Sequence, residues 1–160
     1  MKKAPEKQHK TFLDLFFQTT ENYSVVIVDD DEYFKKLLIQ SIVDHASNLK
    51  ILYHAKIKVY SYNSADSFLD SFYSHQFDGT RTVFFIDYFL EKNRNATHIL
   101  RSIKGAPNHR AVILSEIKNY LTSEESLLLG ADQFLRKDQF TTFMCTTLLE
   151  QFIQEDAASY

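Results

Sequence analysis

The stretch VVIVDDDEYF, residues Val25 to Phe34, runs four apolar residues directly into three aspartates and a glutamate. The apolar run is typical of a buried strand. From Glu32 to about Asn48 the pattern predicts a helix whose apolar face has these positions: Phe34, Leu37, Leu38, Ser41, Ile42 and His45. Like charges buried side by side cost free energy unless a cation or a proton neutralises them. The stretch therefore predicts a strand, an acidic turn and a helix, with a metal site at the turn.

The same alternation of strand and helix runs through the rest of the chain. After the first strand at 24–28, we expect strands at 55–62, 82–87, 111–115 and 133–137. Helical patterns separate them, with Ser64 as the N-cap of the second helix and a last helix at 140–153. This order predicts an α/β fold, a doubly wound five-stranded parallel sheet with helices on both faces.

The composition is that of a globular protein with one domain. The 160 residues are 44% hydrophobic and 24% charged, and the formal net charge of -3 gives no reason to expect nucleic acid as a partner. The single cysteine, Cys145, excludes a disulfide framework and a thiolate metal cluster. No apolar stretch is long enough for a signal sequence or a membrane span, so we expect a cytoplasmic protein.

The domain itself is expected over residues 24–154. Residues 1–23 are interpreted as an N-terminal extension and residues 155–160 as a C-terminal tail, with no output domain after the last helix. Apolar side chains of the extension fall on one side of a short amphipathic helix: Phe12, Leu13, Phe16 and Phe17. This extension offers an extra surface for contact with the domain or with a partner.

Four of the five predicted strands carry a chemically distinctive residue at the carboxyl end. In chain order these residues are Asp29, Asp30 and Asp31, then Asp87, Ser115 and Lys137. In open parallel sheets, ligands bind beyond the carboxyl ends of the strands, so the fold gathers these side chains into one cleft. Ligand sets made only of oxygen suit a hard cation such as Mg²⁺.

The chemistry of this cleft suggests phosphoryl transfer to a carboxylate. A lysine and a hydroxyl can donate hydrogen bonds to phosphate oxygens, and an aspartate is a competent nucleophile for phosphorus. The metal and the lysine would neutralise the charge of the transition state. The chain has only three glycines and no glycine-rich phosphate loop, so a nucleotide is not expected to be the direct donor.

Five segments together resemble the receiver domain of two-component response regulators: VVIVDDDEYFKKLL, VYSYNSADSFL, TVFFIDYFLEKN, AVILSE and LGADQFLRKD. They occur in the family's order and at compatible spacings. The resemblance implies a flavodoxin-like sheet with strand order 2-1-3-4-5 and a single-domain response regulator. Such a protein is not an enzyme with an external substrate, because it catalyses only its own phosphorylation and dephosphorylation.

The resemblance also implies a Mg²⁺ site and a phospho-acceptor. Asp87 would accept the phosphoryl group and contribute to the metal site. Asp30 would bind Mg²⁺ directly, Asp29 would act mainly through a metal-bound water, and Phe89 would offer its backbone carbonyl. Phe89 is bulky and lies two residues after the acceptor, so it is also a candidate shield for the acyl phosphate.

Three further residues would respond to the phosphoryl group. Ser115 would donate a hydrogen bond to it and Lys137 would pair with it. Phe134 occupies the aromatic switch position that family members couple to the hydroxyl residue, here Ser115. The implied partners are a sensor histidine kinase or a histidine phosphotransfer protein, a downstream protein that binds the region 120–153, and a second copy in a homodimer.

Four residues depart from the family pattern, and the first of them, Glu91, stands where the family often has proline. Asn95 replaces the usual glycine eight residues after the acceptor, and asparagine tolerates left-handed backbone geometry. Glu116 replaces a small residue, where a carboxylate is placed to crowd or repel an incoming phosphoryl group. Asp138 replaces the proline after Lys137, so we expect a trans peptide bond there, because a cis bond before a non-proline costs about 2.5–4 kcal/mol.

Two other functions fit parts of the pattern. A degenerate receiver that acts as a phosphorylation-independent docking or dimerisation module is favoured by Glu116 and Asp138. A phosphatase of the haloacid-dehalogenase type would use Asp29 and Asp31 as a D-x-D pair. It would leave Asp87 unused, and this sequence has no late acidic pair to complete the metal site of such an enzyme. Replacing Asp29 and Asp87 separately distinguishes the phosphatase from the receiver.

Overall fold

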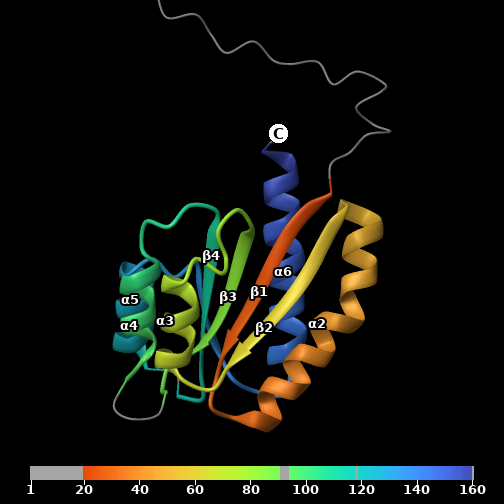
Figure 1. The fold of residues 1–160 in the computed structure, drawn as a ribbon. Coiled ribbons are helices and arrows are strands. Elements are labelled where there is room, and N and C mark those ends of the chain that lie inside the picture. Colours follow the sequence, from red (N-terminus) through yellow and green to blue (C-terminus); the bar gives the residue numbers. More distant parts are fainter. Residues whose placement is uncertain (1–19, 91–93, 118, 160) are drawn as a thin grey trace, which may run out of the picture.

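The computed structural model describes residues 20–90, 94–117 and 119–159. In chain order the elements are β1 (Glu21–Val28), α2 (Glu32–Tyr53), β2 (Ala55–Tyr62), α3 (Ala65–Tyr73), β3 (Arg81–Asp87), α4 (Ala96–Ile103), β4 (His109–Ser115), α5 (Tyr120–Leu128), β5 (Gln133–Arg136) and α6 (Thr141–Ala158). All neighbouring strands pair in parallel, in the order β2-β1-β3-β4-β5 (Figure 1). The predicted α/β fold and its strand order are confirmed.

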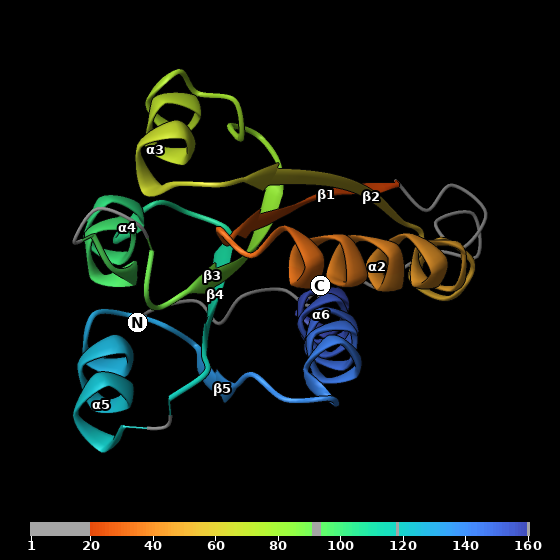
Figure 2. The same ribbon diagram turned by 90° about the horizontal axis from the view of Figure 1, so that it is seen from below.

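The sheet separates two helical layers, with α2 and α6 on one face and α3, α4 and α5 on the other (Figure 2). Successive residues of β1 point to opposite faces. Ile27 packs in the hydrophobic cluster on the α2 and α6 side, whereas Val26 and Val28 pack in the cluster on the α3 and α4 side. A strand buried on both faces needs a continuous apolar sequence, and residues 25–28 provide it. The aspartates begin directly after β1 ends at Val28.

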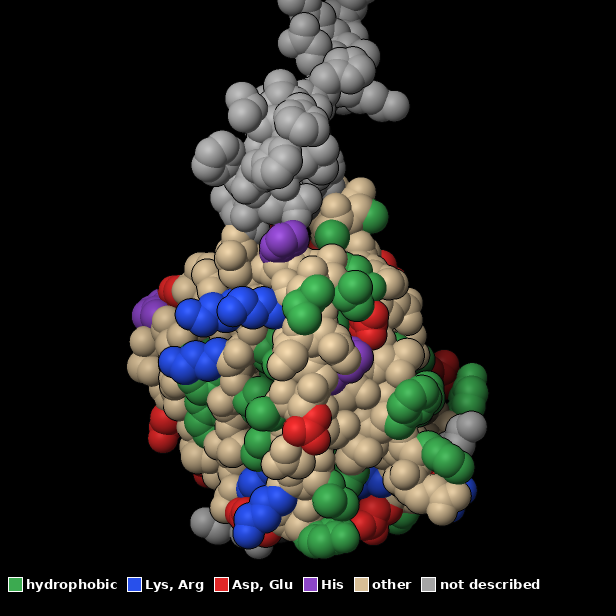
Figure 3. Space-filling model, turned by 90° about the vertical axis from the view of Figure 1, so that its right-hand side faces the viewer, with side chains coloured by type: hydrophobic (Ala, Val, Ile, Leu, Met, Phe, Trp, Pro, Cys, Tyr) green, Lys and Arg blue, Asp and Glu red, His purple; other side chains and the backbone are tan. Residues whose placement is uncertain are grey.

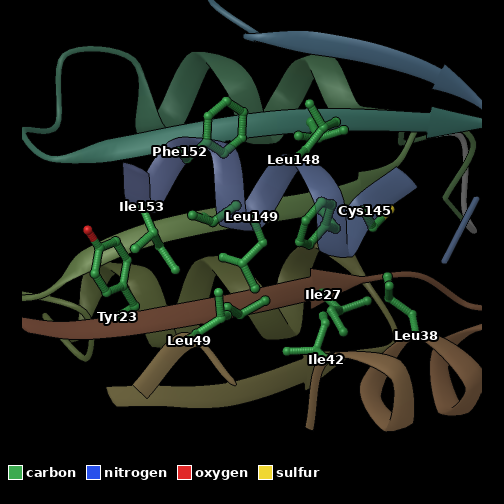
Figure 4. Close-up of a cluster of buried hydrophobic side chains, with 14 of the residues drawn as sticks. Tyr23, Ile27, Leu38, Ile42, Leu49, Cys145, Leu148, Leu149, Phe152 and Ile153 are labelled. Carbon is green, nitrogen blue, oxygen red and sulfur yellow. The ribbon is translucent and has the colours of Figure 1, made fainter. Parts of the chain in front are cut away.

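Helix α6 closes the first of these clusters. Figure 4 shows Cys145, Leu149 and Ile153 of α6 facing the side chains of β1 and α2. Cys145 is fully buried, as predicted for a residue of the helix core. On the side of the molecule where α2 lies, exposed hydrophobic side chains form separate small groups between charged ones (Figure 3).

Helix α2 is longer than the sequence indicated and buries a slightly different stripe. Its buried residues are Lys35, Leu38, Ile42 and Leu49, while Leu37, which was predicted to be part of the apolar face, is 46% exposed. The helix continues past Asn48 because its end is built at His54. This residue adopts φ 55°, and its N–H donates to the carbonyls of Leu49 and Lys50, which completes a left-handed C-cap.

The first strand and the last helix both extend a few residues beyond their predicted bounds. Strand β1 begins at Glu21 rather than Ser24, because the Glu21 N–H donates to the carbonyl of His54 and the strand pairs with β2 from there. Helix α6 continues to Ala158, so most of the predicted tail is helical. Asp156 holds this last turn, since it accepts a hydrogen bond from Tyr23 and pairs with Arg81. The predicted helix at Phe12 to Phe17 lies outside the described residues.

The prediction for Asn95 was also wrong. Its φ of −125° is extended, and the left-handed region is not used. Asn95 is instead the N-cap of α4, and its side-chain oxygen accepts a hydrogen bond from the N–H of Thr97. A short polar side chain serves this role well, because it satisfies one of the free N–H groups of the first helical turn. Within the described residues, no helix is long and apolar enough to cross a membrane.

The second cluster depends on Phe68 of α3, which is fully buried. Its ring contacts the rings of Tyr62, Phe72, Phe77 and Phe84 at centroid distances of 5.6–6.2 Å.

We expect Phe68→Ala to lower the free energy of unfolding by about 3–5 kcal/mol, through lost burial and a cavity. Urea denaturation measures this, with Phe143→Ala as the control. Phe143 is 66% exposed, and its loss should cost less than about 0.5 kcal/mol.

Candidate functional site

Three carboxylates meet where β1 and β3 end. The two strands are direct neighbours in register up to Val28 and Ile86, so Asp29 and Asp87 follow at the same edge of the sheet. One oxygen each from Asp29, Asp30 and Asp87 lie within 4.8 Å of one another. Asp29 is 1% exposed and Asp87 is 7% exposed, so two of the three charges are buried. The predicted acidic cluster is therefore present, and its members come from two strands.

Lys137 binds both buried carboxylates. Its Nζ lies 2.7 Å from Asp29 Oδ2 and 3.1 Å from Asp87 Oδ1. The backbone N–H of Lys137 donates to the backbone carbonyl of Ser115, which holds the lysine directly beyond the end of β5. The aromatic ring of Phe34 lies 4.7 Å from the ammonium and adds a cation–π contact. The described backbone contains no cis peptide bond, so the bond before Asp138 is trans as expected, and the lysine still reaches the carboxylates.

Burial shifts the pKa values of Asp87 and Asp29 and acts on that of Lys137. It raises the pKa of Asp87 to about 7, against the lowering effect of Lys137, and the nearby charge of Asp29 raises it further. Burial likewise raises the pKa of Asp29, although Lys137 opposes the shift. Burial alone would lower the pKa of Lys137, but its bonds to the two aspartates outweigh this and the pKa is raised. The site therefore holds more negative charge than one ammonium can neutralise.

Ser115 lies at the end of β4 and is fully buried. Its hydroxyl donates to the carbonyl of Ile117 at 3.0 Å and accepts from the N–H of the same residue at 3.3 Å. The hydroxyl is thus engaged with its own chain, on the segment that leads to α5. Glu116 beside it is exposed.

The two aromatic residues implied by the resemblance lie on one side of the site. Phe134 of β5 is half-buried, and its ring lies 6.4 Å from the ring of Tyr88. Phe89 is 51% exposed, and its ring makes an edge contact with Tyr88 at 4.8 Å. It forms an isolated bridge with Asn95, which closes the loop after Asp87. The proposed metal contact of the Phe89 carbonyl stays a prediction.

Asp31 and Glu32 serve α2 and do not join the carboxylate cluster. Asp31 is the N-cap of the helix, and its carboxylate accepts hydrogen bonds from the N–H groups of Tyr33 and Phe34. Its own N–H donates to Asp29 Oδ1 at 2.9 Å. Glu32 pairs with Lys35 at 2.9 Å. Acidic residues in a first helical turn are stabilised by the helix dipole.

Sequence reasoning missed Lys35, which is only 3% exposed. Its ammonium donates to the backbone carbonyl of Asp29 at 3.1 Å, to Glu32, and to the side-chain oxygen of Asn63. These bonds connect the acidic turn to the end of β2, a strand for which no contribution was predicted. Its burial could have been predicted from the sequence, because Lys35 precedes Leu38 and Ile42 at the helical spacing of the buried stripe.

Neither a protein-family model nor a curated protein matches this sequence. Solved structures do match its fold. A CheY-like response regulator receiver domain protein from Methanospirillum hungatei JF-1 is 16% identical with a TM-score of 0.64, over 85% of this chain and 98% of that one. The BeF3-activated receiver domain of DrrB, a Thermotoga maritima OmpR/PhoB homolog, is 17% identical with a TM-score of 0.62, over 82% and 97%.

A two-component response regulator from Clostridium difficile is 13% identical with a TM-score of 0.63, over 82% of this chain and 96% of that one. All three similarities span the sheet and both helical layers, because each covers more than four fifths of this chain. Together with the observed strand order, they show that the chain has the fold of the receiver domains of response regulators.

Proposed function

We propose that this protein is a response regulator that accepts a phosphoryl group on Asp87 in a Mg²⁺-dependent reaction. The observation that carries the proposal is the meeting of three carboxylates and one ammonium at the carboxyl edge of the sheet, with Lys137 bound to both Asp29 and Asp87. The fold supports it, since residues from β1, β3 and β5 are brought together at the edge where such sheets bind ligands.

The residues present fit a hard divalent cation. The ligand atoms are carboxylate oxygens, and the buried Asp29 Oδ2 receives no hydrogen bond of regular geometry although Lys137 lies beside it. Asp29, Asp30, Asp87 and the Phe89 carbonyl would hold the ion. When bound, Mg²⁺ would neutralise the carboxylates and polarise the phosphoryl oxygens. It would also favour the ionised form of Asp87, which is the nucleophilic form.

The chain's own groups then carry out the transfer. An oxygen of Asp87 forms a bond to phosphorus while the bond between phosphorus and the donor's imidazole nitrogen breaks, and the electron pair stays on the nitrogen. Lys137 is already within 3.1 Å of Asp87, so its ammonium is placed to bind a phosphoryl oxygen and stabilise the added negative charge. Ser115 would have to turn its hydroxyl from Ile117 to donate to the phosphoryl group.

The donor would be a phosphohistidine of a sensor histidine kinase or a phosphotransfer protein. The output would be a contact between proteins through the region 120–153, as a homodimer or with a downstream target. Large apolar side chains are exposed there, including Tyr120 and Leu121 on α5 and Phe140 and Phe143 at the start of α6. A groove of about 460 Å³ lies between the end of β5 and the start of α6, and its lining residues are Leu135, Arg136, Asp138, Phe140, Thr141, Phe143 and Met144.

The two alternatives differ in what they require of the aspartates. The phosphatase needs Asp31 free to act beside Asp29, but the Asp31 carboxylate caps α2. The docking module needs no chemistry at Asp87, so it gives no role to the ion pairs of Lys137 with Asp29 and Asp87. The arrangement of Lys137 across Asp29 and Asp87 favours the receiver.

Incubation with acetyl phosphate and Mg²⁺ tests the proposal directly. We expect intact mass spectrometry to show one added phosphoryl group on the wild type and none on Asp87→Asn, because only the carboxylate can attack phosphorus. Chelation of the metal should abolish the adduct. Asp29→Asn should bind Mg²⁺ more weakly but still form some adduct at high Mg²⁺.

The matched control is Asp44→Asn, which removes an exposed carboxylate of α2 and should be phosphorylated like the wild type. A wild type that binds Mg²⁺ but takes up no phosphoryl group would contradict the receiver and favour the docking module. Hydrolysis of phosphate esters that is lost in Asp29→Asn but kept in Asp87→Asn would favour the phosphatase.

The raised pKa of Asp87 gives a second prediction, on stability without divalent cations. The folded protein holds this proton up to about pH 7, whereas the ordinary pKa of an aspartate carboxyl is 3.8, so wild-type stability should fall as the pH rises between these values. Asp87→Asn lacks this titration and should be more stable than the wild type above pH 7, by about 1–3 kcal/mol.

Urea denaturation as a function of pH measures this difference. The gap between Asp87→Asn and the wild type should widen from about pH 4 to pH 7 and stay constant above. Saturating Mg²⁺ should narrow it, because the ion stabilises only the intact site. A gap that is independent of pH would show that Asp87 is ionised throughout this range.

A further inference from the structure

Lys35 is a buried lysine to which the phosphoryl transfer described above gives no role. It lies in the first turn of α2, and only 3% of its surface is exposed. A buried ammonium costs free energy unless acceptors surround it. Lys35 Nζ donates to the Asp29 carbonyl at 3.1 Å, to Glu32 Oε1 at 2.9 Å and to the side-chain oxygen of Asn63. These three acceptors match the three N–H groups of an ammonium, so the head group is fixed in direction as well as in position.

The end of β2 holds the backbone of Asp29 at both of its polar groups. The Asp29 N–H donates directly to the carbonyl of Tyr62, the last residue of this strand, at 3.0 Å. The Asp29 carbonyl is held indirectly, because Lys35 donates both to it and to Asn63, the residue after Tyr62. The lysine therefore completes a connection between the acidic turn and β2.

The direction of the Asp29 carbonyl affects where Asp30 lies. A peptide unit is planar, so the carbonyl of Asp29 and the N–H of Asp30 move together. Asp29 and Asp30 each contribute one oxygen to the group of three carboxylates that lie within 4.8 Å of one another. A rotation of this peptide unit would shift Asp30 relative to Asp29 and Asp87, and the three oxygens would no longer converge.

Charge alone would give Lys35 the opposite effect on a metal. The ammonium lies beside the acidic turn, and a positive charge there repels a divalent cation and weakens its binding. Positioning of the ligands by the same ammonium strengthens binding, because the carboxylates need no rearrangement when the ion arrives. The two effects have opposite signs, so removal of the lysine shows which of them is larger.

We infer that Lys35, anchored by Asn63, is a positioning residue of the candidate Mg²⁺ site, and that it strengthens metal binding by fixing the peptide unit between Asp29 and Asp30. The inference rests on the proposed function, since it concerns the metal of the same site. It gives β2 a part in the site, although this strand contributes no carboxylate to the cluster.

Calorimetric titration of the full chain with Mg²⁺ tests the inference without a phosphodonor. We expect Lys35→Met to raise the Kd for Mg²⁺ about tenfold or more, which is the usual effect of removing a residue that orients metal ligands. Lys35→Arg keeps the charge and the donors, so it should bind Mg²⁺ more tightly than Lys35→Met. The matched control is Lys36→Met, which removes the same charge from the next, exposed residue and should leave the Kd close to that of the wild type.

Asn63→Ala separates position from charge, because it removes one acceptor of Lys35 and leaves every charge in place. We expect the Kd for Mg²⁺ to rise severalfold. Asn63 is exposed, so this variant should stay folded and decides the question even if Lys35→Met does not fold. Asn48→Ala, at an exposed position of α2, is its control and should bind Mg²⁺ like the wild type.

The dependence of phosphorylation on Mg²⁺ distinguishes positioning from general destabilisation. With acetyl phosphate, Lys35→Met should need more Mg²⁺ than the wild type for half of the maximal adduct. It should reach the same maximum when Mg²⁺ is saturating, because Lys35 acts through the backbone of Asp29 and not on Asp87. A variant that is only less stable would bind Mg²⁺ with the wild-type Kd in its folded fraction.

The titrations also separate the inference from the proposed function. A wild-type Kd in folded Lys35→Met or in Asn63→Ala would overturn the inference and leave the proposed function standing. Tighter binding of Mg²⁺ by Lys35→Met would overturn it as well, because the lysine would then act mainly through its charge. No binding of Mg²⁺ by the wild type would overturn the proposed function and the inference together.

Discussion

The ion pairs of Lys137 with Asp29 and Asp87 are the interaction on which the candidate site depends. They join residues from β5, β1 and β3, which lie in different parts of the sequence and are not all neighbours in the sheet. Two buried carboxylates beside each other would repel, and the ammonium between them reduces that cost. It does not remove it, since the pKa of Asp87 is still raised to about 7. The site is therefore stable enough to form and still has an affinity for further positive charge.

The surroundings of these three groups are arranged to hold them in place. Lys35 donates to the backbone carbonyl of Asp29, and the backbone N–H of Asp31, the N-cap of α2, donates to the Asp29 carboxylate. Phe34 covers the ammonium of Lys137. None of these residues needs to touch a substrate. They limit the movement of the charged groups, and such preorganisation is how proteins stabilise developing charge.

The opposite side of the site is less constrained. Strand β3 ends in Asp87 and is followed by Tyr88, and α5 packs there with a single buried residue. A rigid site beside a weakly held helix would suit the proposed response regulator, because local stability sets which element can move at low cost. The same weak packing explains why large apolar side chains of α5 remain exposed and available to a partner.

The sequence predicted the fold well because the pattern of buried strands is strong. Continuous apolar runs such as 25–28 and 83–86 are typical of strands covered on both faces, and their alternation with helices leaves few topologies. Helix ends were less predictable. His54 ends α2 through a left-handed C-cap, and Asp156 holds the last turn of α6 through Tyr23 and Arg81. The contacts of Asp156 join residues far apart in the chain and leave no local pattern. The cap at His54 is local, but histidine is not the glycine that usually marks such a helix end.

The sequence by itself determined the order of the strands along the chain and the residues at their carboxyl ends, since hydrophobic periodicity is a local property that sets which face each side chain occupies. Only the tertiary structure decided what those residues do with one another. It decided that Asn95 caps α4 where a left-handed residue was expected, and that the Ser115 hydroxyl bonds to Ile117. It also turned Lys35 inward to Asp29 and placed Tyr88 against Glu125. Hydrogen bonds and ion pairs act over a few ångströms, so they depend on positions that only packing fixes.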